Sequence, residues 1–576
     1  MSRRSSKLLW LKALAIATLA TIASPLPGRT AERITAYFPP FKDLSVSVRD
    51  LEAFAADGKI PAAYADLAKQ TPPAQLQQFR QSLRQRFETT PTYVNQLTRA
   101  PLVLRLLDRI GDSIQADGRR NGSQSIRTAL VRAARDKAGL TPLNFLRRFP
   151  SREVNLNLAE VFTIYDNLTE LYKRRDRTVA TLDRLAATAT TDTQRNFSTP
   201  LDLRRAGSVQ WQRRQYNWLD RSRSVSSGES RQRRVPADLY LPQTTATNLP
   251  VIVISHGVAE DRTTYAYLAR HLASYGFAVA VVEHVGGDAN RFRNYFANTA
   301  PPPMATELLE RPRDVSFVLD ELQRRSQSDP TLRQLDLQNV GLVGHSLGGY
   351  TVLALAGAEI DFDRVKRDCN PNRSLNLSVL LQCRANELPP RNYALKDPRV
   401  RAIFAISPLD STIFGRRGMS QIQLPVFLMG GSDDIITPAI PEQIYPFTWL
   451  QTPDKYLAIV EKGTHFSTQD IDPTQQSAFP VSDGLIGPEP AQARAYAQAL
   501  SVAFFQTHLS NRNDFRPYLS AAYAKSLAPI GLGSGTVGVA AGNRSSLRLN
   551  LVGASASEAI VEALQQDTSR APKLVQ

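Results

Sequence analysis

The sequence contains little cysteine and little histidine, which limits the kinds of site that it can hold. Its 576 residues include only 2 Cys and 6 His. A protein with several zinc sites needs more histidine and cysteine, and a scaffold built on many disulfides needs more cysteine. Hydrophobic residues make up 42% of the chain and charged residues 21%. These values are typical of a globular protein and argue against a wholly disordered chain or a polytopic membrane protein.

The chain is long and strongly basic. At 576 residues it exceeds the roughly 250–300 residues that a single core usually serves, so we expect two domains or one domain with large additions. The formal net charge is +17, which would suit nucleic acid, an anionic membrane surface or no specific partner. We expect no nucleic-acid partner, because the arginine-rich stretch at residues 204–234 lacks a recognisable binding motif. An anionic membrane surface stays a candidate partner.

The N-terminus has the layout of a secretory signal peptide. Arg3, Arg4 and Lys7 precede an apolar stretch at residues 8–23, which is too short and too interrupted for a comfortable membrane span. We therefore predict a signal peptide at residues 1–31 and a secreted or periplasmic protein, with a retained N-terminal anchor as the alternative.

Export also bears on the two cysteines. In an oxidising compartment Cys369 and Cys383 can pair and close a loop of about 15 residues, which would stabilise the fold by roughly 3 kcal/mol. Two free buried thiols are the alternative. Both cysteines fall in a long connection at residues 359–398, which we interpret as a cap-like insertion.

The periodicity of the apolar residues divides the chain into regions. Helical spacing prevails from residue 32 to 187, where Thr141 followed by Pro142 predicts the start of a short helix. We predict a small all-α domain there, of unknown role. From residue 197 to 527, short apolar runs alternate with amphipathic helical patterns, which predicts a mostly parallel sheet with helices on both faces. Residues 528–576 begin rich in glycine and are predicted to form a C-terminal tail.

A glycine-rich turn follows the strand predicted at residues 340–343. Residues 344–348 read G-H-S-L-G, and an apolar helical stretch comes next. A strand, a G-x-S-x-G turn and a helix form the nucleophile elbow of the α/β-hydrolase fold, in which the serine hydroxyl projects from the sheet near a helix N-terminus. Ser346 is therefore the predicted nucleophile.

A serine nucleophile needs a base, and in this fold the acid and the histidine follow the serine in the chain. Only His465 and His508 come after Ser346. His508 lies in a helical pattern, whereas His465 follows a predicted strand end, so His465 is the predicted base. Asp434, after the strand predicted at residues 425–429, is the predicted acid, and Asp410, after the strand at 400–406, is the alternative.

The strand predicted at residues 249–254 ends where an oxyanion hole needs a donor. We predict that the backbone N–H groups of Val258 and Leu347 form this hole. His256, His284 and His345 also follow predicted strands, but no carboxylate-rich or H-E-x-x-H pattern accompanies them. We expect neither a metal nor a cofactor.

Several of these motifs resemble known hydrolase families. Residues 255–258 and 281–284 resemble the secreted platelet-activating-factor acetylhydrolases. Residues 344–349, 434–438 and 463–466 resemble the corresponding motifs of bacterial cutinases and polyester hydrolases. The complete layout is similar to bacterial proteins labelled predicted dienelactone hydrolases, although true dienelactone hydrolases use a cysteine nucleophile.

The resemblance implies a serine hydrolase that cleaves carboxylic esters, including short-acyl or lipid esters. The acetylhydrolase likeness favours Asp410 as the acid, because that family takes its acid after the earlier strand. The cutinase-like spacing favours Asp434, which we prefer. Two alternatives stay open: an exported hydrolase of another acyl substrate, such as a peptide or thioester, and a catalytically inactive binding or scaffold protein.

Overall fold

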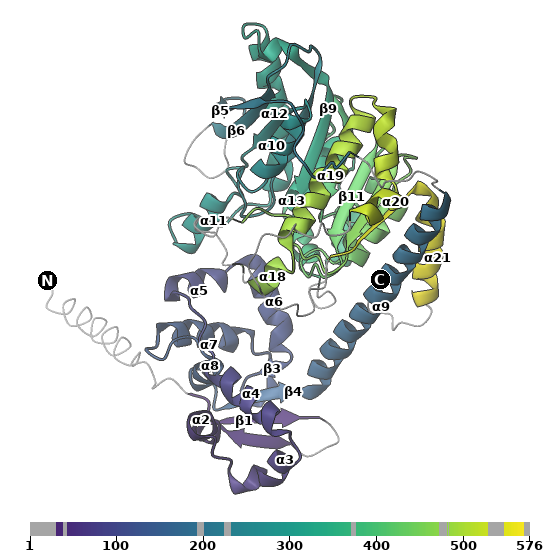
Figure 1. Cartoon of the computed structure of the whole chain (residues 1–576). Coiled ribbons are helices and arrows are strands. Elements are labelled where there is room, and N and C mark those ends of the chain that lie inside the picture. The colour runs from purple at the N-terminus through teal and green to yellow at the C-terminus, as the bar shows by residue number, and fades with distance from the viewer. Residues whose placement is uncertain are drawn as a thin grey trace, which may run out of the picture. The chain divides into compact units, whose positions relative to one another are not determined.

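The computed structural model describes residues 30–38, 43–192, 201–223, 232–369, 376–471, 481, 483–527 and 547–568. Apart from its last two residues, the predicted signal peptide lies outside the described part of the chain. The chain forms two compact units, Met1–Leu168 and Thr169–Gln576, and the long helix α9 (Leu158–Asp192) runs across the boundary between them (Figure 1). None of the described helices is both long enough and apolar enough to cross a membrane.

The N-terminal unit contains a sheet as well as helices. Its four strands lie in the order β2-β1-β4-β3, with β1 parallel to β4 and the other pairs antiparallel. The strands are β1 (Arg33–Tyr37), β2 (Leu44–Ser47), β3 (Ile114–Gln115) and β4 (Glu153–Asn157). The helices are α2 (Val48–Asp57), α3 (Ala65–Lys69), α4 (Pro73–Arg84), α5 (Pro91–Leu97), α6 (Pro101–Gly111), α7 (Ser123–Arg135) and α8 (Pro142–Arg147).

The expectation of an all-α unit therefore needs correction. The strands have two to five residues each, too few to show a clear alternation of apolar and polar side chains. The central pair joins Arg33 to Glu153, and a pairing across so many residues leaves no local signal. One helix start was predicted correctly, since the Thr141 hydroxyl caps α8 by accepting a hydrogen bond from the Asn144 N–H at 3.0 Å.

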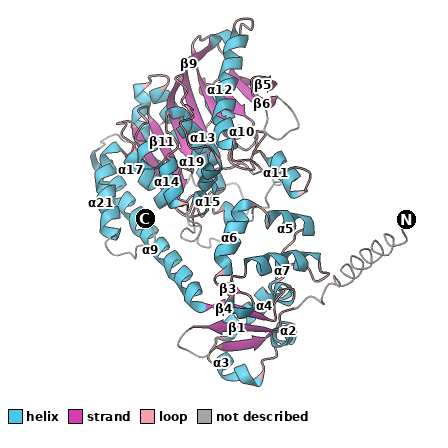
Figure 2. Ribbon diagram, turned by 180° about the vertical axis from the view of Figure 1, so that it is seen from behind, coloured by secondary structure: helices cyan, strands magenta, loops and turns pink. Residues whose placement is uncertain are grey.

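The C-terminal unit has the α/β-hydrolase architecture that the sequence predicted. Its nine strands lie in the order β13-β12-β11-β10-β9-β7-β8-β6-β5, and the central pairs from β12 to β8 are parallel (Figure 2). The strands are β5 (Trp211–Asp220), β6 (Arg233–Pro242), β7 (Leu249–Ser255), β8 (Ala278–Val282), β9 (Leu335–His345), β10 (Val400–Ile406), β11 (Val426–Gly431), β12 (Lys455–Val460) and β13 (Leu549–Gly553).

Helices cover both faces of this sheet. Along β7, Val251 and Val253 belong to one buried cluster and Ile252 and Ile254 to the other, as alternation along a doubly covered strand requires. Residues of α12, α13 and α21 complete the first cluster, and residues of α10, α19 and α20 complete the second. The helices are α10 (Ala266–Ser274), α11 (Ala289–Phe296), α12 (Glu307–Ser326), α13 (Leu347–Ala356), α14 (Phe362–Asp368), α15 (Leu377–Gln382), α16 (Gly415–Met419), α17 (Tyr445–Trp449), α18 (Asp483–Ile486), α19 (Pro490–His508), α20 (Ala521–Ser526) and α21 (Ser557–Thr568).

The last described segment differs from the tail that we expected. β13 pairs antiparallel with β12, with Leu551 opposite Ala458, and Ile560 of α21 is 1% exposed in the core. The sheet and core therefore extend into residues 547–568, while the glycine-rich residues 531–542 lie outside the described part of the chain. A five-residue strand isolated after a glycine-rich stretch has no flanking pattern that would mark it in the sequence.

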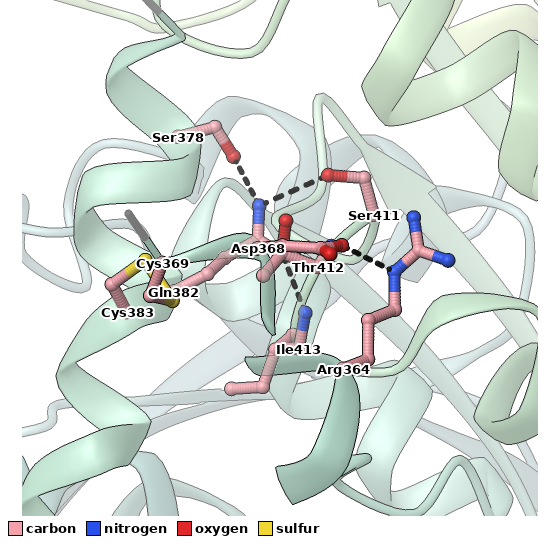
Figure 3. Close-up of a disulfide and its surroundings, with 9 residues drawn as sticks. All are labelled: Arg364, Asp368, Cys369, Ser378, Gln382, Cys383, Ser411, Thr412 and Ile413. Atoms are coloured by element: carbon pink, nitrogen blue, oxygen red, sulfur yellow. Dashed lines mark hydrogen bonds and ion pairs between the residues drawn. A yellow bond between two sulfur atoms is a disulfide. The ribbon is translucent and has the colours of Figure 1, made fainter. Parts of the chain in front are cut away.

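The predicted disulfide between Cys369 and Cys383 is present. It joins the end of α14 to the residue after α15, within the long connection between α13 and β10 (Figure 3). The neighbouring Gln382 accepts hydrogen bonds from the N–H groups of Thr412 and Ile413, at 2.7 and 2.8 Å. The disulfide-linked segment is thus tied to the loop that follows β10.

Candidate active site

Ser346 lies at the sharp turn between β9 and α13. Its backbone has φ 55° and ψ −118°, a conformation that costs a non-glycine residue on the order of 1–3 kcal/mol. The Ser346 N–H donates to the Ile406 carbonyl of the neighbouring strand at 2.9 Å, which helps to hold the turn. The residue is 4% exposed, so Ser346 is largely buried.

Two glycines of the turn are required by close packing. A Cβ atom at Gly344 would collide with the carbonyl oxygen of Gly348. A Cβ atom at Gly348 would collide with the carbonyl oxygen of Ser255 at the end of β7. Because these contacts are with backbone atoms, a side chain at either position would force the turn apart. The G-x-S-x-G spacing therefore reflects the geometry of this elbow.

The structure brings Ser346, His465 and Asp434 together. The His465 Nε2 atom lies 3.1 Å from the Ser346 Oγ, and the His465 Nδ1 atom lies 2.8 Å from the Asp434 Oδ2. His465 follows β12 and Asp434 follows β11, so all three residues come from the carboxyl ends of parallel strands, where ligands bind in such sheets. Each is at most 5% exposed. The arrangement gives a hydroxyl, an imidazole and a carboxylate in one chain of hydrogen bonds.

The surroundings of Asp434 keep its carboxylate charged. Burial raises its pKa, but the neighbouring His465 and the hydrogen bonds from Thr437 outweigh burial and hold the pKa of Asp434 below its usual value. The Thr437 N–H donates to Oδ1 and the Thr437 hydroxyl to Oδ2, both at 2.7 Å, and the Ile436 N–H donates to Oδ1 at 2.9 Å. A charged carboxylate with this many donors can orient the imidazole and stabilise its protonated form.

Asp410, the alternative acid, has a different environment. Its carboxyl is fully buried, and neither of its oxygens has a hydrogen-bond partner within the described residues. Its backbone N–H donates to the Glu442 carboxylate at 3.2 Å. Burial and the nearby Glu442 charge raise the pKa of Asp410 well above its usual value. The structure therefore places Asp410 beside Glu442 and pairs His465 with Asp434.

The predicted oxyanion donors, Val258 and Leu347, lie on two adjoining segments. Leu347 is the first residue of α13, where a backbone N–H has no partner within the helix. Val258 lies in the loop after β7. Within the described residues, no hydrogen-bond acceptor is found for either N–H group.

A buried arginine, which the sequence analysis missed, holds the two backbone carbonyls that precede Val258. Arg311 of α12 is 0% exposed, and its guanidinium donates to the carbonyls of His256 at 2.5 Å and of Gly257 at 3.1 Å. In a trans peptide the C=O and the following N–H point in opposite directions. Since the Gly257 carbonyl faces Arg311, the Val258 N–H faces away from it. No sequence motif marks an arginine on α12 for this role.

His256 and His284, which also follow strands, are held within the protein. The His284 Nδ1 lies 2.9 Å from the Asp314 carboxylate, and its Nε2 lies 2.9 Å from the Ser255 hydroxyl. The backbone N–H of His284 donates to the His256 Nε2 at 3.0 Å. Burial, with the Arg311 charge, lowers the pKa of His284 to about 4. The described residues contain no group of side chains suited to hold a metal ion.

A polar pocket of about 490 Å³ lies at the ends of β7 and β8. Its lining includes Arg262, Glu283 and residues of α11 such as Arg291. Burial, together with the nearby Asp288 charge, raises the pKa of Glu283 to about 7. None of the three residues in the Ser346 hydrogen-bond chain lines this pocket, so it is a separate feature of the same sheet edge.

The sheet order and the elbow give the C-terminal unit the α/β-hydrolase fold. Comparison with protein families gives two matches along the chain. Residues 30–157 match a family described as alpha/beta hydrolase of unknown function. Residues 216–308 match the family described as platelet-activating factor acetylhydrolase, isoform II. The first match covers the N-terminal unit, and the second runs from β5 to the start of α12.

Individual relatives show the same likeness. The chain is 30% identical over 152 residues to platelet-activating factor acetylhydrolase of Cavia porcellus, covering 21% of this chain and 34% of the relative. The corresponding protein of Canis lupus familiaris is 24% identical over 293 residues, covering 49% and 62%. Chlorophyllase-1 of Citrus sinensis is 30% identical over 120 residues, covering 20% and 32%.

These matches confirm the resemblance to the platelet-activating-factor acetylhydrolases. The chain spans between about a third and three fifths of the length of these curated relatives. The second family match contains β7, the loop with Val258, and β8. It therefore covers the segment whose motifs suggested the resemblance.

Proposed function

We propose that the protein is a serine hydrolase of carboxylic esters. The observation that carries this proposal is the continuous hydrogen-bond chain from the Ser346 hydroxyl through His465 to Asp434, at an elbow that opens a helix. The names of the acetylhydrolase and chlorophyllase relatives support ester hydrolysis. The leaving group and acyl length are proposed only as far as small-molecule or lipid esters.

Each residue has a role in the proposed reaction. His465 Nε2 takes the proton of Ser346 as its Oγ bonds to the acyl carbon, and Asp434 stabilises the resulting imidazolium. The Val258 and Leu347 N–H groups donate to the oxyanion. When the C–O bond to the leaving group breaks, His465 gives its proton to the departing alcohol. Water, activated by His465, then releases the acid and restores the Ser346 hydroxyl.

Chemical labelling tests this proposal independently of the natural substrate. The purified protein should hydrolyse short p-nitrophenyl esters and react with a fluorophosphonate, with the label mapped by mass spectrometry to Ser346. Ser346→Ala should abolish both signals, because it removes the attacking oxygen. Ser255 provides an internal control and should stay unlabelled. Its hydroxyl lies 2.9 Å from the His284 ring, but the residue is only 1% exposed.

The opposite results would refute the proposal in different ways. Normal turnover by Ser346→Ala would exclude Ser346 as the nucleophile. A folded wild-type protein that is neither labelled nor active would support the inactive binding protein that the sequence left open. If ester hydrolysis is found, a panel of short acyl esters, acetylated phospholipid, polyester, thioester and peptide identifies the preferred leaving group.

We further propose that the protein is exported and meets an anionic membrane surface. The disulfide suits an oxidising compartment, and the net charge of +17 suits anionic lipid. The arginine-rich stretch contributes less than its composition suggests, since Arg204, Arg214, Arg223 and Arg233 each pair with a carboxylate. Vesicles containing anionic lipid should pellet the protein at low salt and release it at high salt; no salt-sensitive binding would exclude this surface.

A further inference from the structure

A buried carboxylate connects the segments around the Ser346 site. Glu260, in the loop after β7, is 9% exposed. Its Oε2 accepts a hydrogen bond from the Gly257 backbone N–H at 2.7 Å. Gly257 lies in the loop that carries Val258. Its Oε1 lies 2.7 Å from the His345 Nδ1 and accepts from the Gln469 side chain at 2.8 Å. Glu260 thus contacts three segments. They are the loop after β7 that carries Val258, which we call the oxyanion loop, the elbow, and the loop that follows His465.

His345 continues this connection to the proposed base. Its Nε2 lies 3.1 Å from the His465 carbonyl oxygen, and the side chain is 1% exposed. A backbone carbonyl only accepts hydrogen bonds, so this ring nitrogen must carry a proton. The bond fixes the backbone position of His465, whose own ring contacts Ser346.

Both ring nitrogens of His345 therefore face acceptors. Glu260 already accepts hydrogen bonds from the Gly257 N–H and the Gln469 amide, as a carboxylate does. An ionised Glu260 needs a proton on the His345 Nδ1, while the His465 carbonyl needs one on Nε2. Only an imidazolium supplies both. The histidine is thus held as a buried cation by a carboxylate and a carbonyl.

The other groups around His345 agree with this charge state. Its ring centre lies 4.7 Å from that of His465 and 5.5 Å from that of Tyr265. Burial lowers the pKa of His345, but the charge and hydrogen bond of Glu260, with the more distant Asp434 charge, outweigh burial and raise the pKa above the ordinary value. The Tyr265 pKa is raised well above its usual range by burial and by Glu260, so this phenol stays neutral beside the ion pair.

We propose that Glu260 and His345 form a buried ion pair that positions the oxyanion loop, the Ser346 elbow and the His465 loop relative to one another. This inference rests on the proposed function, because it assigns the pair to the same site. Neither side chain touches the reacting atoms, so both are positioning residues. A neutral His345 has one ring proton, so it could donate to Glu260 or to the His465 carbonyl but not to both. Deprotonation of His345 would therefore remove one of these two hydrogen bonds.

The main test is Glu260→Gln, measured as a full pH profile of ester hydrolysis. A glutamine preserves the size of the side chain but removes the charge, so burial dominates and the pKa of His345 falls. We expect kcat to fall about 10²-fold, the effect of a small misplacement at a catalytic site, with KM little changed. The alkaline limb of the profile, set by deprotonation of His345, should move to lower pH.

Glu442→Gln is the matched control, because Glu442 is also buried and accepts several hydrogen bonds, including those from Ser411 and Gln382. It should lower thermal stability without moving the alkaline limb. The double variant Glu260→Gln with His345→Gln completes a cycle. If the pair acts as a unit, the double variant should be about as active as the single variants, whereas independent roles would multiply the losses.

Nitrogen NMR of labelled histidine gives a readout that needs no activity. The His345 resonances, assigned by their loss in His345→Gln, should show a mostly protonated ring at pH 6.5, where a free histidine is about half protonated. In Glu260→Gln they should show a neutral ring at the same pH. A neutral His345 in the wild-type protein would overturn the inference whether or not the protein hydrolyses esters, as would an unmoved alkaline limb in an active Glu260→Gln variant.

Discussion

Asp434→Asn is expected to lower kcat for ester hydrolysis by about 10⁴-fold, the loss that results when a triad carboxylate becomes an amide. The amide nitrogen of the introduced asparagine would face the ring nitrogen that now donates to the carboxylate. His465 would then favour the tautomer that cannot accept the Ser346 proton. Folding should be largely preserved, because the Thr437 and Ile436 donors can still find the amide oxygen.

Asp410→Asn is the matched comparison, since both positions are buried aspartates that follow neighbouring strands. Burial and the neighbouring Glu442 raise the pKa of Asp410 well above its usual value, and a carboxyl that keeps its proton cannot stabilise an imidazolium. We expect kcat to stay within a few-fold of wild type. Steady-state kinetics on one p-nitrophenyl ester decides between the two residues. A large loss in Asp410→Asn with little change in Asp434→Asn would reverse the assignment and favour the acid position implied by the acetylhydrolase likeness.

The stability of the Asp410 variant provides an independent check. An unfolded aspartate has a pKa of about 3.9, while folded Asp410 keeps its proton to higher pH. The folded state therefore binds more protons than the unfolded state above that value, and stability must fall as the pH rises toward the folded pKa. Asp410→Asn removes the titrating carboxyl, so this decrease of stability with rising pH should be absent in the variant. At neutral pH the variant should be at least as stable as wild type in urea unfolding.

The residues that the sequence could predict are those tied to local motifs and chain order. The elbow glycines identified Ser346 because the turn itself requires them. The order rule left only His465 and His508, and the strand before His465 decided between them. The structure brings these residues together with Asp434 and places the Val258 and Leu347 N–H groups on adjoining segments. All of these features depend on the residues directly after a strand, which a sequence displays without any knowledge of the fold.

The residues that the sequence could not reveal act across the fold. Arg311 contacts the oxyanion loop from α12, and Glu260 meets His345 only because β7 and β9 are neighbours in the sheet. No spacing along the chain encodes either contact. The short strands of the N-terminal unit were missed for the same reason, since β1 is completed by a partner more than a hundred residues away.

A second hydrogen-bond chain shows why residue types alone do not define a site. Ser255, His284 and Asp314 are connected as Ser346, His465 and Asp434 are, with both distances at 2.9 Å. Ser255, however, is 1% exposed at the end of a strand and does not begin a helix that could stabilise an oxyanion. These hydrogen bonds hold the end of β7, the strand that leads into the oxyanion loop, and their role is therefore structural.

Asp314 is the centre of that support, and its loss should be strongly destabilising. The carboxylate is 0% exposed. It accepts from the Arg233 Nε and Nη2, both at 2.7 Å, and pairs with the Arg223 Nη2 at 2.9 Å. Burial raises the pKa of Asp314, but these arginines and His284 outweigh burial and hold the pKa far below its usual value. A charged Asp314 carboxylate thus compensates two arginines.

Asp314→Asn leaves those arginines with less compensation, and we expect the free energy of unfolding to fall by about 3–5 kcal/mol, as when one partner of a buried pair is removed. Asp320→Asn, on the same helix, removes a carboxylate that is 66% exposed and pairs with Arg399. An exposed pair of this kind contributes less than about 1 kcal/mol. Urea unfolding of both variants measures the contrast, and equal losses would contradict the special role of Asp314.

The pH dependence of the same experiment separates charge from packing. Because folding lowers the pKa of Asp314, its stabilisation is present above the unfolded value of about 3.9 and is lost as the pH falls through the folded pKa. The difference in unfolding free energy between wild type and Asp314→Asn should therefore be largest near neutral pH and shrink in acid. A difference that stays constant with pH would mean that the asparagine disturbs packing rather than removing a needed charge.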